Sequence, residues 1–248
     1  MTKTFLRFIA VIALAIQSSG CAHAKPIRVG LFKDAGAAGK GVPRVTEILG
    51  KTEDIKVTHL TGKEIASGAL TNFDVVMFTG GSGSKEAASL GEKGREEVRQ
   101  FVRGGGGYIG ICAGAYLACT GFDWGVGVLN AKTVSSKWAR GVGQVEIEMM
   151  PKGAALTTLP AGKRKMLYAN GPIIQPDDKN DIPAYETLAF FRTEFAKNGS
   201  PKGVMIDSPA IVRGTYGKGR VLSSSPHPEQ TSGMEDLIPS AVRWVSGK

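Results

Sequence analysis

Two short motifs in this 248-residue chain contain residue types that can perform nucleophilic chemistry together. In the first, residues 104–118, Cys112 lies midway between Gly110 and Gly114. This spacing, between an apolar strand and a helix rich in small residues, is that of a nucleophile elbow with cysteine in place of serine. The sharp turn exposes the thiol, and the glycines remove side chains that would collide with the neighbouring strand and helix. The sequence therefore predicts that Cys112 is a nucleophile.

The residues around this corner predict how it would assist catalysis. The start of the helix after Cys112 favours the thiolate, because helix N-termini attract negative charge. The backbone N–H of Ala113 and one from Gly80 or Gly81, after an earlier strand, are predicted to donate to an oxyanion. Such donors each lower a barrier by on the order of 3 kcal/mol. Tyr116, one helical turn beyond Cys112, either lines the pocket or packs in the core.

The second motif is Pro-His-Pro-Glu at 226–229, which follows a short apolar strand. His227 is predicted to be the base and then the acid, and Glu229 to orient its imidazole, as in a catalytic triad. Strand ends of a parallel sheet meet at one edge, so His227 can lie near Cys112. By itself a His-x-Glu pair also fits a surface turn. His59, in a strand, is predicted to be structural.

Strands and helices alternate along the N-terminal half, which predicts a mainly parallel sheet. We expect a flavodoxin-like, doubly wound α/β fold with helices on both faces and an antiparallel extension in the C-terminal half. Expected strands are 27–32, 56–60, 74–79, 108–111, 142–149, 186–191, 203–206, 210–213 and 220–224, with a hairpin turn at 216–219. Expected helices are 42–49, 84–102, 113–119 and 235–245. One domain, residues 25–248, is predicted.

The first 24 residues have the features of an export signal. Lys3 and Arg7 precede an apolar run, Phe8 to Ile16, and Ala22-His23-Ala24 fits a cleavage site. The run is much shorter than the roughly 20 residues that span a bilayer. Cys21 is an alternative processing site, as the acceptor of a lipid anchor. The chain is thus predicted to be periplasmic or secreted, and membrane-associated only if Cys21 is lipidated.

Composition excludes several function classes. The formal net charge is +9, but Lys and Arg are scattered among acidic residues, so no nucleic-acid partner is expected. No pattern typical of a metal site or a cofactor is present, and neither is expected. Cys112 and Cys119 are seven residues apart, about 10 Å along a helix, too far for a disulfide. Cys119 is predicted to face the core.

Together these residues resemble a known family. Gly110-Ile111-Cys112-Ala113-Gly114, with His227-Pro228-Glu229, is similar to the class I glutamine amidotransferase-like superfamily. The string at 106–116, Gly-Gly-Tyr-Ile-Gly-Ile-Cys-Ala-Gly-Ala-Tyr, resembles the biotin–protein ligase N-terminal domain family within it. The resemblance implies a flavodoxin-like sheet and a Cys-His-Glu triad, but not biotin ligation, because the catalytic domain of the ligase is not recognised in the chain.

The first functional hypothesis is a thiol hydrolase that cleaves an amide or peptide bond of a small molecule or peptide through a thioester. Glutamine-dependent synthesis is disfavoured, because the sequence has no ATP-binding loop and no synthase domain. The alternatives are a non-catalytic binding or regulatory domain that retains the pocket, and a redox role for Cys112. The sequence leaves the oligomeric state open.

Overall fold

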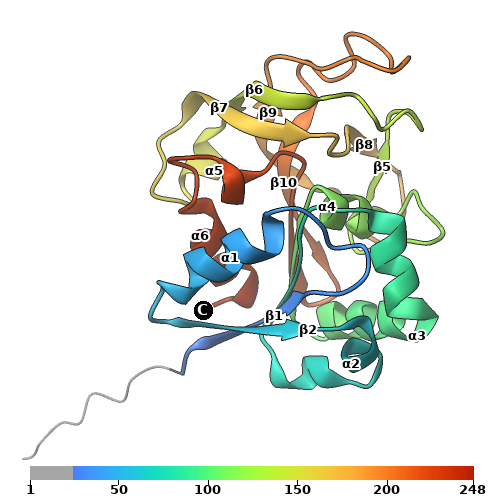
Figure 1. Ribbon diagram of the computed structural model, residues 1–248, viewed down its shortest axis with the longest axis vertical. Helices are drawn as coiled ribbons and strands as arrows, with labels where there is room; N and C mark the ends of the chain where they lie inside the picture. Colours follow the sequence, from blue (N-terminus) through green and yellow to red (C-terminus); the bar gives the residue numbers. More distant parts are fainter. Residues whose placement is uncertain (1–24) are drawn as a thin grey trace, which may run out of the picture.

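The computed structural model describes residues 25–248, and the predicted signal segment lies outside them. Within this part, one nine-stranded mixed sheet runs in the order β2-β1-β3-β4-β11-β10-β9-β6-β7 (Figure 1). The strands are β1 (Ile27–Phe32), β2 (Ile55–Leu60), β3 (Val75–Phe78), β4 (Gly107–Ile111), β6 (Val142–Met149), β7 (Gly162–Ala169), β9 (Glu186–Phe191), β10 (Pro209–Tyr216) and β11 (Gly219–Ser224). A separate two-stranded sheet pairs β5 (Ala131–Thr133) with β8 (Ile174–Pro176).

The first five strands in this order are parallel, and the other four are antiparallel. The predicted fold class, a parallel α/β sheet with an antiparallel C-terminal extension, is confirmed. The helices are α1 (Gly41–Gly50), α2 (Gly62–Ala66), α3 (Gly83–Arg103), α4 (Ala113–Ala118), α5 (Pro151–Ala154) and α6 (Leu237–Ser246), with short 3-10 turns η1 (Ala69–Asn72) and η2 (Pro228–Gln230).

Alternate residues of the central strands enter two different cores. Met77 and Ile109 contact the core under α1 and α6, whereas Phe78 and Tyr108 contact the core under α3 and α4. Figure 1 shows these two pairs of helices on opposite sides of the sheet. Because both faces of the sheet are covered there, the central strands β3 and β4 are apolar at nearly every position, as expected for buried parallel strands.

One predicted strand is wrong, and several elements were not predicted. Residues 203–206 form bends and a turn, because Gly203 and Asp207 have φ of 78° and 61°, which is incompatible with an extended chain at either end. The side chain of Met205 nevertheless packs in the core. Strand β7, whose lysines and arginine obscure its alternation, was missed, and so were β5, β8, α2 and α5.

Candidate functional site

The corner between β4 and α4 has the backbone of a nucleophile elbow. Cys112 has φ of 52° and ψ of −98°, in a region that non-glycine residues rarely adopt. Its N–H donates to the carbonyl of Ser224 at 2.8 Å, and the N–H of Gly114 donates to the carbonyl of Thr79 at 3.1 Å. Strain of this kind costs about 1–3 kcal/mol and is often found at functional sites. Hydrogen bonds to two neighbouring strand ends hold the strained residue in place.

The two glycines beside Cys112 are required by close backbone approaches. A Cβ on Gly110 would lie 2.4 Å from the carbonyl oxygen of Gly114, and a Cβ on Gly114 would lie 2.5 Å from that of Phe78. Backbone oxygens of a packed sheet and helix cannot withdraw by the distance needed to relieve these clashes. The Gly-x-Cys-x-Gly spacing therefore permits the sharp turn, as the sequence predicted.

His227 and Glu229 form a buried, hydrogen-bonded pair just after β11. The Nδ1 atom of His227 lies 2.8 Å from Oε1 of Glu229, and the two residues are 4% and 0% exposed. The N–H of His227 donates to the carbonyl of Leu167 on β7 at 2.8 Å, which anchors the loop. Nε2 of Gln230 also donates to Glu229, at 2.9 Å. Glu229 thus accepts a hydrogen bond from the Nδ1–H group, and the opposite ring nitrogen, Nε2, points away from it.

The structure brings this imidazole to Cys112. Burial by itself lowers the pKa of His227, but the neighbouring Cys112 and Glu229 outweigh this effect and raise the pKa to about 10. Nε2 of His227 is buried and, among residues 25–248, has no hydrogen-bond partner with normal geometry. The Cys112 Sγ atom lies 3.4 Å from the carbonyl oxygen of Ala169, to which the neutral thiol donates.

Two of the three predicted oxyanion donors line one cavity with Cys112. The cavity has a volume of about 300 Å³, and Gly81 and Ala113 contribute to its wall. The N–H of Ala113 has no acceptor among the described residues. Gly80 does not line the cavity. A Cβ on Gly80 would lie 2.8 Å from Cε1 of His227, so this glycine makes room for the imidazole. The backbone of Gly80 therefore packs behind the predicted base.

Tyr116 lines the cavity, which is one of the two positions predicted for it. Its hydroxyl donates to the carbonyl of Asn170 at 3.1 Å. Sequence reasoning did not identify Asn170, whose φ is 58°. The Asn-Gly pair at 170–171 is a turn signal that pointed to a sharp bend after β7. The remaining lining residues come from the start of α3, the ends of β5 and β7, and the loops after α4 and β5: Ser82, Gly83, Ser84, Phe122, Trp124, Thr133, Ser135, Ser136, Trp138 and Ala169.

The other residues examined in the sequence lie outside this site. Cys119 is fully buried, and burial, with a smaller effect of Asp177, raises the pKa of its thiol to about 12. Both cysteines in the described part are free. His59 lies on the exposed edge strand β2, where Nε2 is 2.9 Å from the hydroxyl of Thr46. Across residues 25–248, no group of three or more His, Cys, Asp or Glu side chains is arranged to hold a metal ion.

Comparison with solved structures assigns the fold. A glutamine amidotransferase aligns over 89% of this chain and 99% of its own, with 21% identity and a TM-score of 0.59. PurLQS from Thermotoga maritima aligns over 90% and 98%, with 14% identity and a TM-score of 0.60. A ThuA-like protein from Parabacteroides merdae aligns over 90% and 91%, with 14% identity and a TM-score of 0.59. The fold is that of class I glutamine amidotransferase-like proteins.

At the sequence level, residues 28–139 match the family described as biotin-protein ligase, N terminal. The predicted resemblance is thereby confirmed, for a family domain in this segment. The segment includes Gly81 and Cys112 but ends before His227 and Glu229. No curated protein matches the chain. In the part of the chain that the structure describes, no helix is both long and apolar enough to cross a membrane.

Proposed function

We propose that this protein is a cysteine-dependent hydrolase that cleaves an amide or peptide bond through a thioester. The observation that carries the proposal is the strained Cys112 at the end of β4, beside the adjacent strand β11 that leads to a buried imidazole held by Glu229. A structural cysteine needs neither positive φ nor a buried His–Glu pair. The fold supports the proposal only at the level of amidotransferase-like proteins.

In the proposed reaction the Cys112 thiolate attacks the carbonyl carbon, and the carbonyl π electrons move to oxygen. The C–N bond of the tetrahedral intermediate then breaks, and the imidazolium of His227 gives its proton to the departing amine. Water attacks the thioester as His227 accepts its proton. The C–S bond breaks, which releases the carboxylic acid and the thiolate. Glu229 keeps the imidazole oriented and stabilises its positive charge throughout.

The proposed oxyanion donors are the N–H groups of Ala113 and Gly81. Both residues line the cavity next to Cys112, and the N–H of Ala113 has no competing acceptor in the described part. Helix α4 has only six residues, so its dipole adds little, and the individual N–H groups would provide most of the stabilisation. Removal of one such donor typically costs 10²- to 10³-fold in rate.

We further propose that the protein acts after export. The basis is the sequence of residues 1–24, with cleavage after Ala24 or lipidation at Cys21 as the two processing routes. The proposed partners are a small-molecule or peptide amide, with no nucleic acid and no resident cofactor. Mass spectrometry of the mature N-terminus would distinguish the routes, and an unprocessed Met1 would contradict export by either one.

Alkylation with iodoacetamide tests the nucleophile directly. If Cys112 forms a thiolate–imidazolium pair, it should react at pH 6 at least ten times faster than a free thiol, whose pKa is about 8.5. Cys119 is an internal control, because it is fully buried and its thiol has a raised pKa. Peptide mapping should therefore find label on Cys112 alone.

A matched Cys112→Ala variant should lose both the label and the hydrolysis of any amide in a substrate panel. If Cys112 reacts no faster than a free thiol at pH 6, the hydrolase proposal fails. If Cys112 is reactive but no amide or peptide is cleaved, a redox role becomes the better interpretation.

A further inference from the structure

The cavity beside Cys112 has two unlike walls. Cys112, Ala113 and Gly81 form the wall at which the chemistry would occur. Aromatic rings from α4 and the following loops form another: Tyr116, Phe122, Trp124 and Trp138. The rings of Phe122 and Trp124 stack with centroids 4.5 Å apart, and Tyr116 lies 6.0 Å from Phe122. Such a wall favours a ligand with a flat apolar face.

Trp138 is the most exposed member of this wall. It is 60% exposed, although large hydrophobic side chains are mostly buried in this fold. The tryptophan follows Ser135 and Ser136, which also line the cavity, so it lies at the rim where a ligand would enter. Tryptophan is enriched among the residues that contribute most to binding energy, so this exposed ring is a candidate ligand contact.

None of the fifteen lining residues in the described part carries a charged side chain. The polar side chains of the lining residues are the hydroxyls of Ser82, Ser84, Thr133, Ser135, Ser136 and Tyr116, the thiol of Cys112, the amide of Asn170, and the indole N–H groups of Trp124 and Trp138. These groups hydrogen-bond neutral amides and hydroxyls well. A free amino acid brings an ammonium and a carboxylate, and burying either without a charged partner is strongly unfavourable. The lining therefore matches an uncharged ligand.

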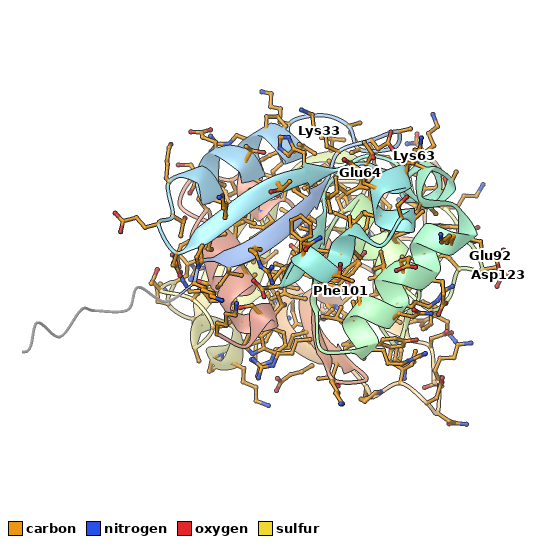
Figure 2. All side chains as sticks on the ribbon, turned by 90° about the horizontal axis from the view of Figure 1, so that it is seen from below. Lys33, Lys63, Glu64, Glu92, Phe101 and Asp123 are labelled. Atoms are coloured by element: carbon orange, nitrogen blue, oxygen red, sulfur yellow. The ribbon has the colours of Figure 1, made fainter. Side chains whose placement is uncertain are left out.

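The charged residues nearest in sequence do not supply the missing partners. Lys85, Asp123 and Lys137 are exposed and do not line the cavity, and Figure 2 shows Asp123 at the outer edge of the molecule. Arg140 is buried, but its guanidinium donates to the carbonyls of Phe195 and Pro201. No acidic side chain among residues 25–248 is positioned in this cavity to hold an ammonium group.

We propose that the Cys112 cavity binds a neutral amide whose acyl or amine side carries a flat, mainly apolar ring, and that it discriminates against free amino acids such as glutamine. The inference rests on the proposed function and adds the substrate class. A volume of about 300 Å³ lies at the lower end of small-molecule sites, so one ring-bearing group fits. The ring would lie on Trp124 and Trp138 while the carbonyl reaches Cys112.

Three alkylating probes with the same reactive group test this inference. N-benzyl-2-chloroacetamide is neutral and carries a ring, Nδ-chloroacetyl-ornithine is a zwitterion, and 2-chloroacetamide has neither feature. Second-order rates of Cys112 labelling are measured at pH 7 and divided by the rates with glutathione. The benzyl probe is expected to exceed the zwitterion at least tenfold. Trp138→Ala should lower the benzyl rate at least threefold more than it lowers the 2-chloroacetamide rate.

Val142→Ala provides a control variant, because Val142 is as exposed as Trp138 and does not line the cavity. It should leave all three rates unchanged. Equal or faster labelling by the zwitterion would overturn the substrate class, and so would an unchanged benzyl rate in Trp138→Ala. In both cases fast labelling by 2-chloroacetamide would leave the hydrolase proposal standing. If all three probes react no faster than with glutathione, the hydrolase proposal fails, and the substrate class fails with it.

Discussion

Gly80→Ala should disable the predicted base without unfolding the protein. The Cβ of alanine would lie 2.8 Å from Cε1 of His227, whereas ordinary contact begins at 3.4 Å. The imidazole must therefore move by the difference, about 0.6 Å. It cannot move freely, because the ring is buried and hydrogen-bonded to Glu229. The backbone at Gly80 itself has no left-handed φ, so alanine adds little strain there.

The expected loss follows from the size of this shift. Catalytic groups need placement within about 0.5 Å, and a misplacement of 1 Å can cost about 10²-fold. A shift of about 0.6 Å should thus slow iodoacetamide alkylation of Cys112 at pH 6 by roughly 10-fold to 100-fold. The assay follows labelled Cys112 by mass spectrometry over time, and a melting curve confirms that the variant is folded.

Gly50→Ala is the matched control for this substitution. Gly50 ends α1, and a Cβ there meets no atom within 4 Å. Alanine should leave the alkylation rate unchanged and should stabilise the helix slightly, by up to about 1 kcal/mol. A folded Gly80→Ala protein that alkylates at the wild-type rate would refute the placement of His227 against Cys112. An equal loss in Gly50→Ala would show that the assay does not report the position of His227.

Three further substitutions test the same geometry. Gly114→Ala should lower the free energy of unfolding by about 3 kcal/mol, because the alanine Cβ would clash with the Phe78 carbonyl. This loss corresponds to a drop in melting temperature of about 6–12 °C, and an unchanged melting temperature contradicts the prediction. Cys112→Ala should lower the pKa of His227 below about 10, because Cys112 is one of the two residues that raise it. An NMR titration that still gives a pKa of about 10 would exclude contact between Cys112 and His227. Glu229→Gln should slow alkylation at pH 6 at least tenfold, since a neutral amide stabilises the imidazolium less than a carboxylate; an unchanged rate would remove Glu229 from the mechanism.

The sequence alone predicted the elements of the parallel half of the sheet and the residues of the proposed chemistry. Apolar strands next to amphipathic helices predicted the parallel half of the sheet, because burial on both faces leaves a continuous apolar pattern. The glycine spacing around Cys112 identified the elbow, because only glycine tolerates the approach of Phe78 and Gly114 carbonyls. Local steric requirements of this kind are visible in a sequence.

The tertiary structure decided which groups share the site. The distance from Cys112 to His227 along the chain is 115 residues, and only the pairing of β4 with β11 brings the two strand ends together. The pairing of β3 with β4 places the two glycines that follow β3 at the same edge, with Gly80 against the imidazole and Gly81 in the cavity wall. Strand register determines such differences.

The aromatic wall likewise depended on tertiary structure. Trp124 and Trp138 come from loops with no regular period, so their sequence gave no direction for the rings. The missed strand β7 ends at Ala169, and this residue and the following Asn170 complete the cavity. Its polar sequence, Gly-Lys-Arg-Lys-Met-Leu-Tyr-Ala, is stabilised by pairing with β6 along its whole length. Long-range pairing, which leaves no local signal, therefore determined the shape of the candidate site.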